Sequence, residues 1–139
     1  MNKNTYIVFF FFALLISICT EASTYYVNSE TGNDANNGKS ESQPWKTLWK
    51  VNQHNFKPGD KILFASGTSY EGVLKPQGSG KKGKVIQINK YGEGANPAIH
   101  GKGWNEAALL LYNVSYWEVR NLEITNQGAK RKAKRRGVI

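Results

Sequence analysis

The fold is decided by residues 60–88, which read DKILFASGTSYEGVLKPQGSGKKGKVIQI. Short apolar runs lie in this stretch, and turns rich in Gly and Lys separate them. Similar runs continue toward residue 124, whereas no helical apolar spacing of useful length follows residue 56. The runs are 61–65, 72–74, 85–88, 98–100, 108–111, 117–119 and 122–124. Strands this short, numerous and separated predict an all-β fold.

The spacing of the runs favours a solenoid over a set of hairpins. Ile62, Val85 and Ala108 begin apolar runs that recur every 23 residues. Asn-Gly hairpin turns are absent after residue 60. In a solenoid, each coil stacks its strands on the next, and the inward Ile, Leu and Val side chains form columns. We therefore expect stacked coils with one shared apolar core.

One amphipathic helix is expected from residue 44 to about residue 55. Trp45, Leu48, Trp49 and Asn52 follow helical spacing, and a proline opens the segment. The first coil of a solenoid needs a cover, because an open sheet edge invites aggregation. We expect this helix to be an N-terminal cap with its tryptophans packed in the core; a sugar-stacking platform is the alternative.

The first 22 residues have the layout of a secretory signal peptide. Lys3 precedes an apolar run at residues 6–18, and small residues at Thr20 and Ala22 mark a cleavage site. The run is shorter than the roughly 20 residues that a membrane span needs, so we expect no membrane span. The predicted location is secreted, periplasmic or on the surface of a bacterial cell. Cys19 is the only cysteine, and its lipidation is the alternative to cleavage after Ala22.

The positive charge is concentrated in one segment. Residues 130–136 read KRKAKRR and carry six of the charges behind the net charge of +9. The segment 23–129 holds 12 Lys or Arg and 9 Asp or Glu, so the predicted folded part is only mildly basic. A nucleic-acid partner does not suit an exported chain. Two interpretations of residues 130–136 remain: a solvated loop, or a loop that meets an anionic polysaccharide.

The order of several loose motifs resembles a known family. They are Tyr25-Tyr26-Val27, Gly32-Asn33-Asp34, Pro44-Trp45-Lys46-Thr47-Leu48, Pro58 to Phe64, Gly67 to Tyr70, Val85 to Tyr91, Pro97 to Gly101 and Tyr116 to Ile124. Together they resemble the N-terminal region of secreted bacterial right-handed parallel β-helix proteins with the pectate-lyase-like fold. The resemblance implies a right-handed parallel β-helix, of which only the first coils are present.

The same resemblance implies a monomeric polysaccharide lyase or glycoside hydrolase in the full-length protein. Lyases of this fold use a Lys or Arg base and often Ca²⁺, both in central coils, and no position of this sequence matches those residues. Fold alone does not fix the reaction. A non-catalytic glycan-binding or adhesin module is therefore the alternative function.

The expected organisation has three segments. Residues 1–22 are the signal peptide, residues 23–129 are the cap and first coils, and residues 130–139 are a basic loop and the start of the next coil. We expect the chain to be an N-terminal portion whose catalytic coils are missing. Expressed alone, it would be poorly soluble and inactive.

Candidate catalytic residues are weak in this sequence. Lys81, Lys82 and Lys84 are clustered, and like charges depress the pKa of a lysine base, but glycines around them indicate an exposed turn. Hydrolysis needs two carboxylates at a set separation. Glu118 and Glu123 are the nearest pair along the chain, yet a turn between them argues against a shared face.

Candidate metal ligands are equally weak. Residues 33–38 (NDANNG) are rich in side-chain oxygen but hold one carboxylate, so Asn and Gly turn chemistry explains them better than calcium does. His54 and His100 are the only histidines and have no evident third partner. Asn113 begins a glycosylation sequon, which means little in a bacterial export. The sequence thus assigns no catalytic, cofactor or metal residue.

Overall fold

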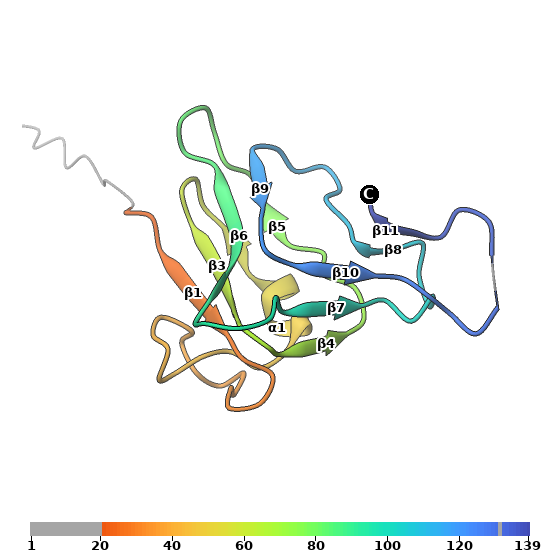
Figure 1. Ribbon diagram of the computed structural model, residues 1–139. Helices are drawn as coiled ribbons and strands as arrows, with labels where there is room; N and C mark the ends of the chain where they lie inside the picture. Colours follow the sequence, from red (N-terminus) through yellow and green to blue (C-terminus); the bar gives the residue numbers. More distant parts are fainter. Residues whose placement is uncertain (1–20, 131) are drawn as a thin grey trace, which may run out of the picture.

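The computed structural model describes residues 21–130 and 132–139, and this part is mostly β-structure (Figure 1). Most of the predicted signal peptide, with Cys19, lies outside the described residues. The all-β class is confirmed. The described part holds no helix that is long and apolar enough to cross a membrane. The elements are β1 (Thr24–Val27), α1 (Leu48–Gln53), β2 (Asn55–Phe56), β3 (Lys61–Ala65), β4 (Ser69–Glu71), β5 (Gln77–Gly78), β6 (Ile86–Tyr91), β7 (Ala98–His100), β8 (Ala107–Leu109), β9 (Trp117–Val119), β10 (Glu123–Thr125) and β11 (Arg136–Val138).

The named strands pair in parallel across the described part of the chain, and they form four sheets. The orders are β1-β3-β6-β9, β4-β7-β10, β8-β11 and β2-β5. The chain runs through β6, β7 and β8, then through β9, β10 and β11, so that each passage adds one strand to each of three sheets (Figure 1). We call one such passage a circuit.

Side chains from successive circuits form columns. Ile62 of β3 pairs with Ile88 of β6, which pairs with Val119 of β9. The 23-residue period was therefore the wrong register, because Val85 lies just before β6 and is 38% exposed. Ala108 belongs to β8, in another sheet. Turns of unequal length between the strands make the true repeat irregular.

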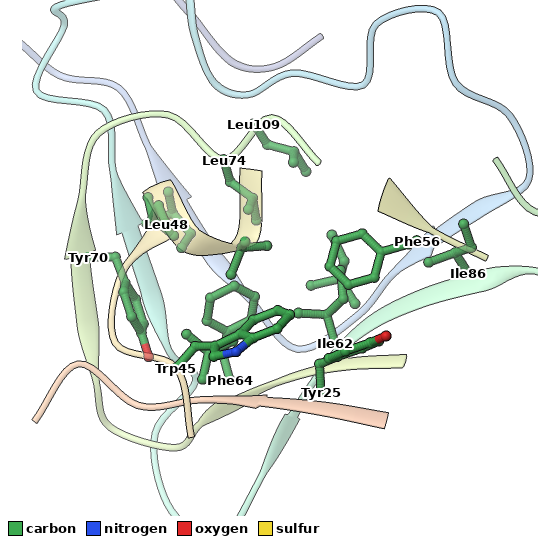
Figure 2. Packing of buried hydrophobic residues seen from close by; sticks show 14 of the residues in the cluster. Tyr25, Trp45, Leu48, Phe56, Ile62, Phe64, Tyr70, Leu74, Ile86 and Leu109 are labelled. Atoms are coloured by element: carbon green, nitrogen blue, oxygen red, sulfur yellow. The ribbon is translucent and has the colours of Figure 1, made fainter. Parts of the chain in front are cut away.

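The core is continuous from β1 to β8 (Figure 2). Tyr25 stacks on Trp45 with ring centroids 4.9 Å apart and meets the edge of Phe56 at 5.4 Å. Aromatic contacts of this kind add stability beyond the area that they bury. Aliphatic side chains such as Ile86 and Leu109 continue the same core toward the later circuits.

The helix is shorter than predicted, because the residues before it are held in an extended conformation. Trp45 forms a parallel bridge with Val27, and its N–H donates to the Tyr26 carbonyl at 2.9 Å. Thr47 is the N-cap and its side chain accepts from the Lys50 N–H at 3.2 Å. A Thr cap satisfies a backbone donor that the first turn leaves unpaired. The helix consequently begins at Leu48 rather than at residue 44.

The two tryptophans of this segment have different environments. Trp45 is buried, as the core interpretation predicts, although it precedes the helix. Trp49 is 65% exposed, so the prediction of core packing is wrong for it. The buried face of the short helix is Leu48 and Val51, and Trp49 points away from that face.

One predicted strand is displaced. The apolar run at 72–74 was expected to pair, but β4 ends at Glu71, and Gly72 has a φ of +119° that no extended strand adopts. Leu74 beyond it is fully buried and makes only an isolated bridge to Leu109. The run therefore supplies core packing rather than a strand.

The two ends of the stack differ. At the β1 end of the stack, which we call the closed end, the outer edge of β1 is hydrogen-bonded: Tyr26 donates to the Gly38 carbonyl at 2.7 Å and Asn28 to the Trp45 carbonyl at 2.8 Å. At the last circuit, which we call the open end, β9, β10 and β11 are the terminal strands of their sheets in the described part. Trp117 and Ile124 are only partly buried there.

Candidate functional site

The lysine cluster lies on an exposed turn. Lys81 and Lys84 hydrogen-bond each other's backbone across Gly83, which has a φ of +77°. Their side chains, with that of Lys82, are exposed between β5 and β6. A catalytic lysine needs a partner or burial that depresses its pKa, and this turn supplies no burial.

The two glutamates do not face one bond. Glu118 lies on β9 and its carboxylate is paired with the Arg120 guanidinium. Glu123 lies on β10, in a different sheet, with an exposed side chain. Asn121, with a φ of +51°, marks the corner between the two strands. The arrangement offers no pair of carboxylates across a common cleft.

The oxygen-rich loop at residues 33–38 uses its side chains for structure. The Asn33 side chain accepts from the Ala35 N–H at 2.9 Å, as in an Asx turn. One Asp34 oxygen accepts from the N–H groups of Lys46 and Thr47 at 2.8 and 3.0 Å, and the other accepts from the Thr47 hydroxyl at 2.6 Å. The carboxylate thus fixes the loop to the N-cap of α1.

The ionisation of Asp34 follows from these bonds. Partial burial acts to raise its pKa, but the hydrogen bonds from Thr47 and Lys46 together hold the pKa below the usual 3.8. Hydrogen bonds to the charged form favour it. Asp34 is therefore a structural carboxylate that stays ionised.

The histidines have separate roles. His54 is the C-cap of α1 and packs 4.5 Å from the Tyr25 ring and 4.6 Å from the Phe56 ring. Burial lowers its pKa below 6.5, and nearby lysines lower it further, against the opposing charge of Asp60. His100 places Nδ1 2.8 Å from the Thr125 hydroxyl on the neighbouring strand. Among the described residues, no three His, Cys, Asp or Glu side chains gather to hold a metal ion.

The best candidate for a binding site is a polar groove of about 480 Å³ that the sequence did not reveal. It lies between the C-terminal end of α1, the segment 75–78 and the segment 112–114. Asn52 fixes its walls: the side chain donates to the Val73 carbonyl at 2.8 Å and accepts from the Lys75 N–H at 2.7 Å. Gln77 donates to the Asn52 carbonyl at 2.6 Å.

The lining of this groove suits binding rather than hydrolysis. Tyr112 is exposed, and the Lys75 ammonium lies 5.9 Å from the centre of its ring. The amides of Gln53 and Asn113 add donors and acceptors for hydroxyl groups. No lining residue in the described chain is a carboxylate, so the groove lacks the acid and base that glycoside hydrolysis needs.

Sequence reasoning could not have found the groove, because three distant segments meet in it. The sequence pattern makes Asn52 a helix position and Asn113 the start of a sequon, and neither pattern indicates a groove. Lys75 and Tyr112 carry no local signal.

The basic segment is also partly structural: Arg135 donates to the Gly103 carbonyl at 3.1 Å and to the Lys130 carbonyl at 2.6 Å.

No family model matches the chain. It is 34% identical over 137 residues to a lacto-N-biosidase of Bifidobacterium longum subsp. longum, an alignment that covers 79% of this chain and 9% of the relative. The crystal structure of a GH136 lacto-N-biosidase from Eubacterium ramulus matches with a TM-score of 0.72 and 37% identity. The native form of the same protein matches at 0.68 and 35%. This chain is similar to GH136 lacto-N-biosidases.

Both crystal structures match 78% of this chain but 21% of their own chains. The chain thus spans about a fifth of the solved relative's length and less of the curated one. The matched proteins are glycoside hydrolases, which agrees with a glycan-degrading protein. They support the hydrolase alternative and give the lyase alternative no support.

Proposed function

We propose that this chain is the N-terminal part of a secreted glycoside hydrolase similar to the GH136 lacto-N-biosidases. The observation that carries the proposal is the match to about a fifth of a solved lacto-N-biosidase, at 37% identity and a TM-score of 0.72. The scattered carboxylates and the groove without an acid support a second point: the residues that cleave the glycan belong to another part of the whole protein.

The proposed fold is a right-handed parallel β-helix. Parallel pairing in each sheet and the column of Ile62, Ile88 and Val119 support stacked coils. In this account residues 28–47 and α1 cap the first coil. The open end is the surface on which the next coil of the whole protein stacks, and it places the catalytic coils at a fixed distance from the cap.

The first experiment compares the whole protein with this chain alone. We expect the whole protein to show lacto-N-biosidase activity and to release products with new reducing ends. Products with an unsaturated uronic acid, or no cleavage of any glycan tested, would overturn the proposal. The chain alone should bind glycans without cleaving them. Hydrolysis by the purified chain would contradict the proposal that the catalytic residues lie in another part of the whole protein.

A non-catalytic glycan-binding module is the second candidate, and the lining of the groove favours it. Tyr112 and the surrounding amides could hold a sugar without cleaving it. Binding of glycans by the whole protein, with no product after long incubation, would establish this alternative. Binding lost in the Tyr112→Ala variant would place the contact in the groove.

Export is part of the proposal. We place the mature N-terminus at Ser23, after cleavage behind Ala22. N-terminal sequencing of the protein recovered outside the cytoplasm tests this directly. Recovery of an intact Met1 or of a lipid-modified Cys19 would contradict it.

A further inference from the structure

The described residues of the basic segment form one wall of a second pocket, on a different part of the surface from the groove. The pocket has a volume of about 410 Å³, within the range of small-ligand sites. Residues 103–106 line one side and residues 132–135 line the other. We call it the basic-loop pocket.

A buried amide fixes the two walls to each other. Asn126 is 8% exposed, and its side-chain oxygen accepts from the Gly103 N–H at 2.9 Å. Its amide nitrogen donates to the Asn105 carbonyl at 3.0 Å and to the Arg136 carbonyl at 2.9 Å. Arg135 adds a bond across the same gap, to the Gly103 carbonyl. Because these bonds exist without a ligand, the shape of the pocket is set in advance.

The packing around Gly103 shows how closely the walls approach. A Cβ atom on Gly103, whose φ is +68°, would lie 2.5 Å from the guanidinium carbon of Arg135. A Cβ on Gly101 would lie 2.4 Å from the Asn126 side-chain oxygen. Both are closer than a real Cβ contact, so a side chain at either position would displace the Asn126 amide or the Arg135 guanidinium that joins the walls.

The lining combines one aromatic face with positive charge. Trp104 is 67% exposed, an unusual position for so large an apolar side chain. Lys132 and Lys134 are exposed beside it, and neither has an ion-pair partner among the described residues. The carboxylate in the pocket, Glu106, lies 3.8 Å from the Arg136 guanidinium, which offsets its charge.

We propose that the basic-loop pocket binds a sugar ring that carries an anionic group, either a carboxylate or a sulfate. The Trp104 indole covers the apolar C–H face of the ring, and Lys132 and Lys134 attract the anion. The choice of a carbohydrate as the ligand rests on the proposed function. The site itself contains no catalytic pair, so it would hold an anionic branch of a glycan while cleavage takes place elsewhere.

The test measures binding separately from cleavage. Calorimetric titration of the whole protein uses a sialylated, a uronic-acid and a sulfated oligosaccharide, each beside its neutral parent. We expect one anionic class to bind about tenfold more tightly than its parent at low salt, and the preference to shrink as salt screens the lysines. Equal binding of charged and neutral sugars, or tighter binding of single-stranded nucleic acid, would overturn the proposal.

Matched variants locate the contact. Trp104→Ala should weaken binding about tenfold, whereas Trp49→Ala, which removes an equally exposed tryptophan from α1, should change nothing. Lys132→Gln and Lys134→Gln should each weaken binding roughly two- to fivefold, and Lys81→Gln serves as their control. An unchanged affinity in Trp104→Ala would refute the site.

Cleavage of neutral substrate distinguishes this inference from the proposed function. We expect it to be unchanged in the Trp104 and lysine variants, because the pocket does not reach the reacting bond. If the whole protein cleaves glycans but shows no anionic preference, only the pocket assignment fails. If it binds anionic glycans and cleaves none, the pocket stands and the hydrolase fails.

Discussion

The closed end and the open end of this molecule differ in how the terminal strands of their sheets are covered. A parallel sheet leaves unpaired N–H and C=O groups on its terminal strand, and these attract another strand. At the closed end, residues 28–47 fold back so that Gly38 and Trp45 supply hydrogen bonds to β1. At the open end, the described residues give β9 and β10 no such loop. A protected edge therefore needs a dedicated segment, and we propose that the unprotected edge is a surface for stacking.

Side chains show the same contrast. Tyr70, Ile99 and Ile124 occupy one column across β4, β7 and β10. Ile99 is completely buried, whereas Ile124 is only partly buried because no circuit covers it in the described part. We therefore expect equivalent positions in the fold to contribute differently to stability according to the end at which they lie.

The largest effect is expected at the closed end. Trp45→Ala removes a ring that stacks on Tyr25 and whose indole N–H donates to the Asn36 carbonyl at 3.0 Å. We expect a loss of about 3–5 kcal/mol in the free energy of unfolding, measured by urea denaturation. The control is Trp49→Ala, which should change stability by about 0.5 kcal/mol or less. Equal losses in the two variants would remove the distinction between a core and a surface tryptophan.

The column of isoleucines gives the next largest effect and sharpens the comparison of ends. Ile99→Ala should destabilise the chain by about 2–5 kcal/mol, whereas Ile124→Ala should cost about 1 kcal/mol. In the whole protein, where we propose that a further coil covers it, Ile124→Ala should become as costly as Ile99→Ala. Thermal or denaturant unfolding of both forms provides the measurement. A cost that stays small in the whole protein would argue against coverage.

Much of this architecture could be predicted from the sequence, because alternating apolar and turn residues record strands directly. The register in which the strands pair could not be predicted in this way. Ile62 pairs with Ile88 rather than with Val85. The turns between the strands differ in length, and no residue pattern in the sequence records those lengths. The helix begins later than predicted for a related reason: Asp34, far away in sequence, accepts hydrogen bonds from the N–H groups of Lys46 and Thr47 and holds these residues in the extended segment before α1.

A smaller effect is expected where Asp34 fixes the loop of the closed end. Asp34→Asn weakens three hydrogen bonds to the N-cap region, and we expect a loss of about 1–2 kcal/mol at neutral pH. The folded-state pKa of Asp34 is lowered, so its stabilisation is full above its ordinary pKa and is lost as the pH falls through the folded value. The advantage of the wild type over Asp34→Asn should therefore shrink as the pH falls below the ordinary value of 3.8. A difference that stays constant from neutral pH into this acidic range would contradict this role.

The smallest effect concerns His54. Because burial lowers its pKa below 6.5, the unfolded chain takes up a proton more readily than the folded chain. Stability should be fully present above about pH 6.5 and should decline as the pH falls below it. The His54→Phe variant keeps an aromatic ring at this position and should lose that dependence between pH 7.5 and pH 5.5 in thermal unfolding. An identical pH profile in both proteins would assign the decline to other groups.

The candidate sites were less predictable than the fold. The pattern of residues 130–136 leaves a solvated loop and a loop that meets an anionic polysaccharide as alternatives, and the structure adds the exposed Trp104 beside it. Nothing near Trp104 in the sequence points to that contact, because Asn126 and Arg135 create it through tertiary hydrogen bonds. Binding sites assembled from separate turns depend on register, which is the feature that sequence patterns record least well.

Hydrogen exchange at the two ends tests the central claim most directly. The measurement compares amides of β9 and β10 with those of β1 and β3, in this chain alone and in the whole protein. We predict that the chain alone protects β1 and β3 but exchanges rapidly at β9 and β10, and that the whole protein protects all four strands. Equal protection of both ends in the chain alone, or an unprotected β9 and β10 in the whole protein, would contradict the account of a closed cap and an open stacking surface.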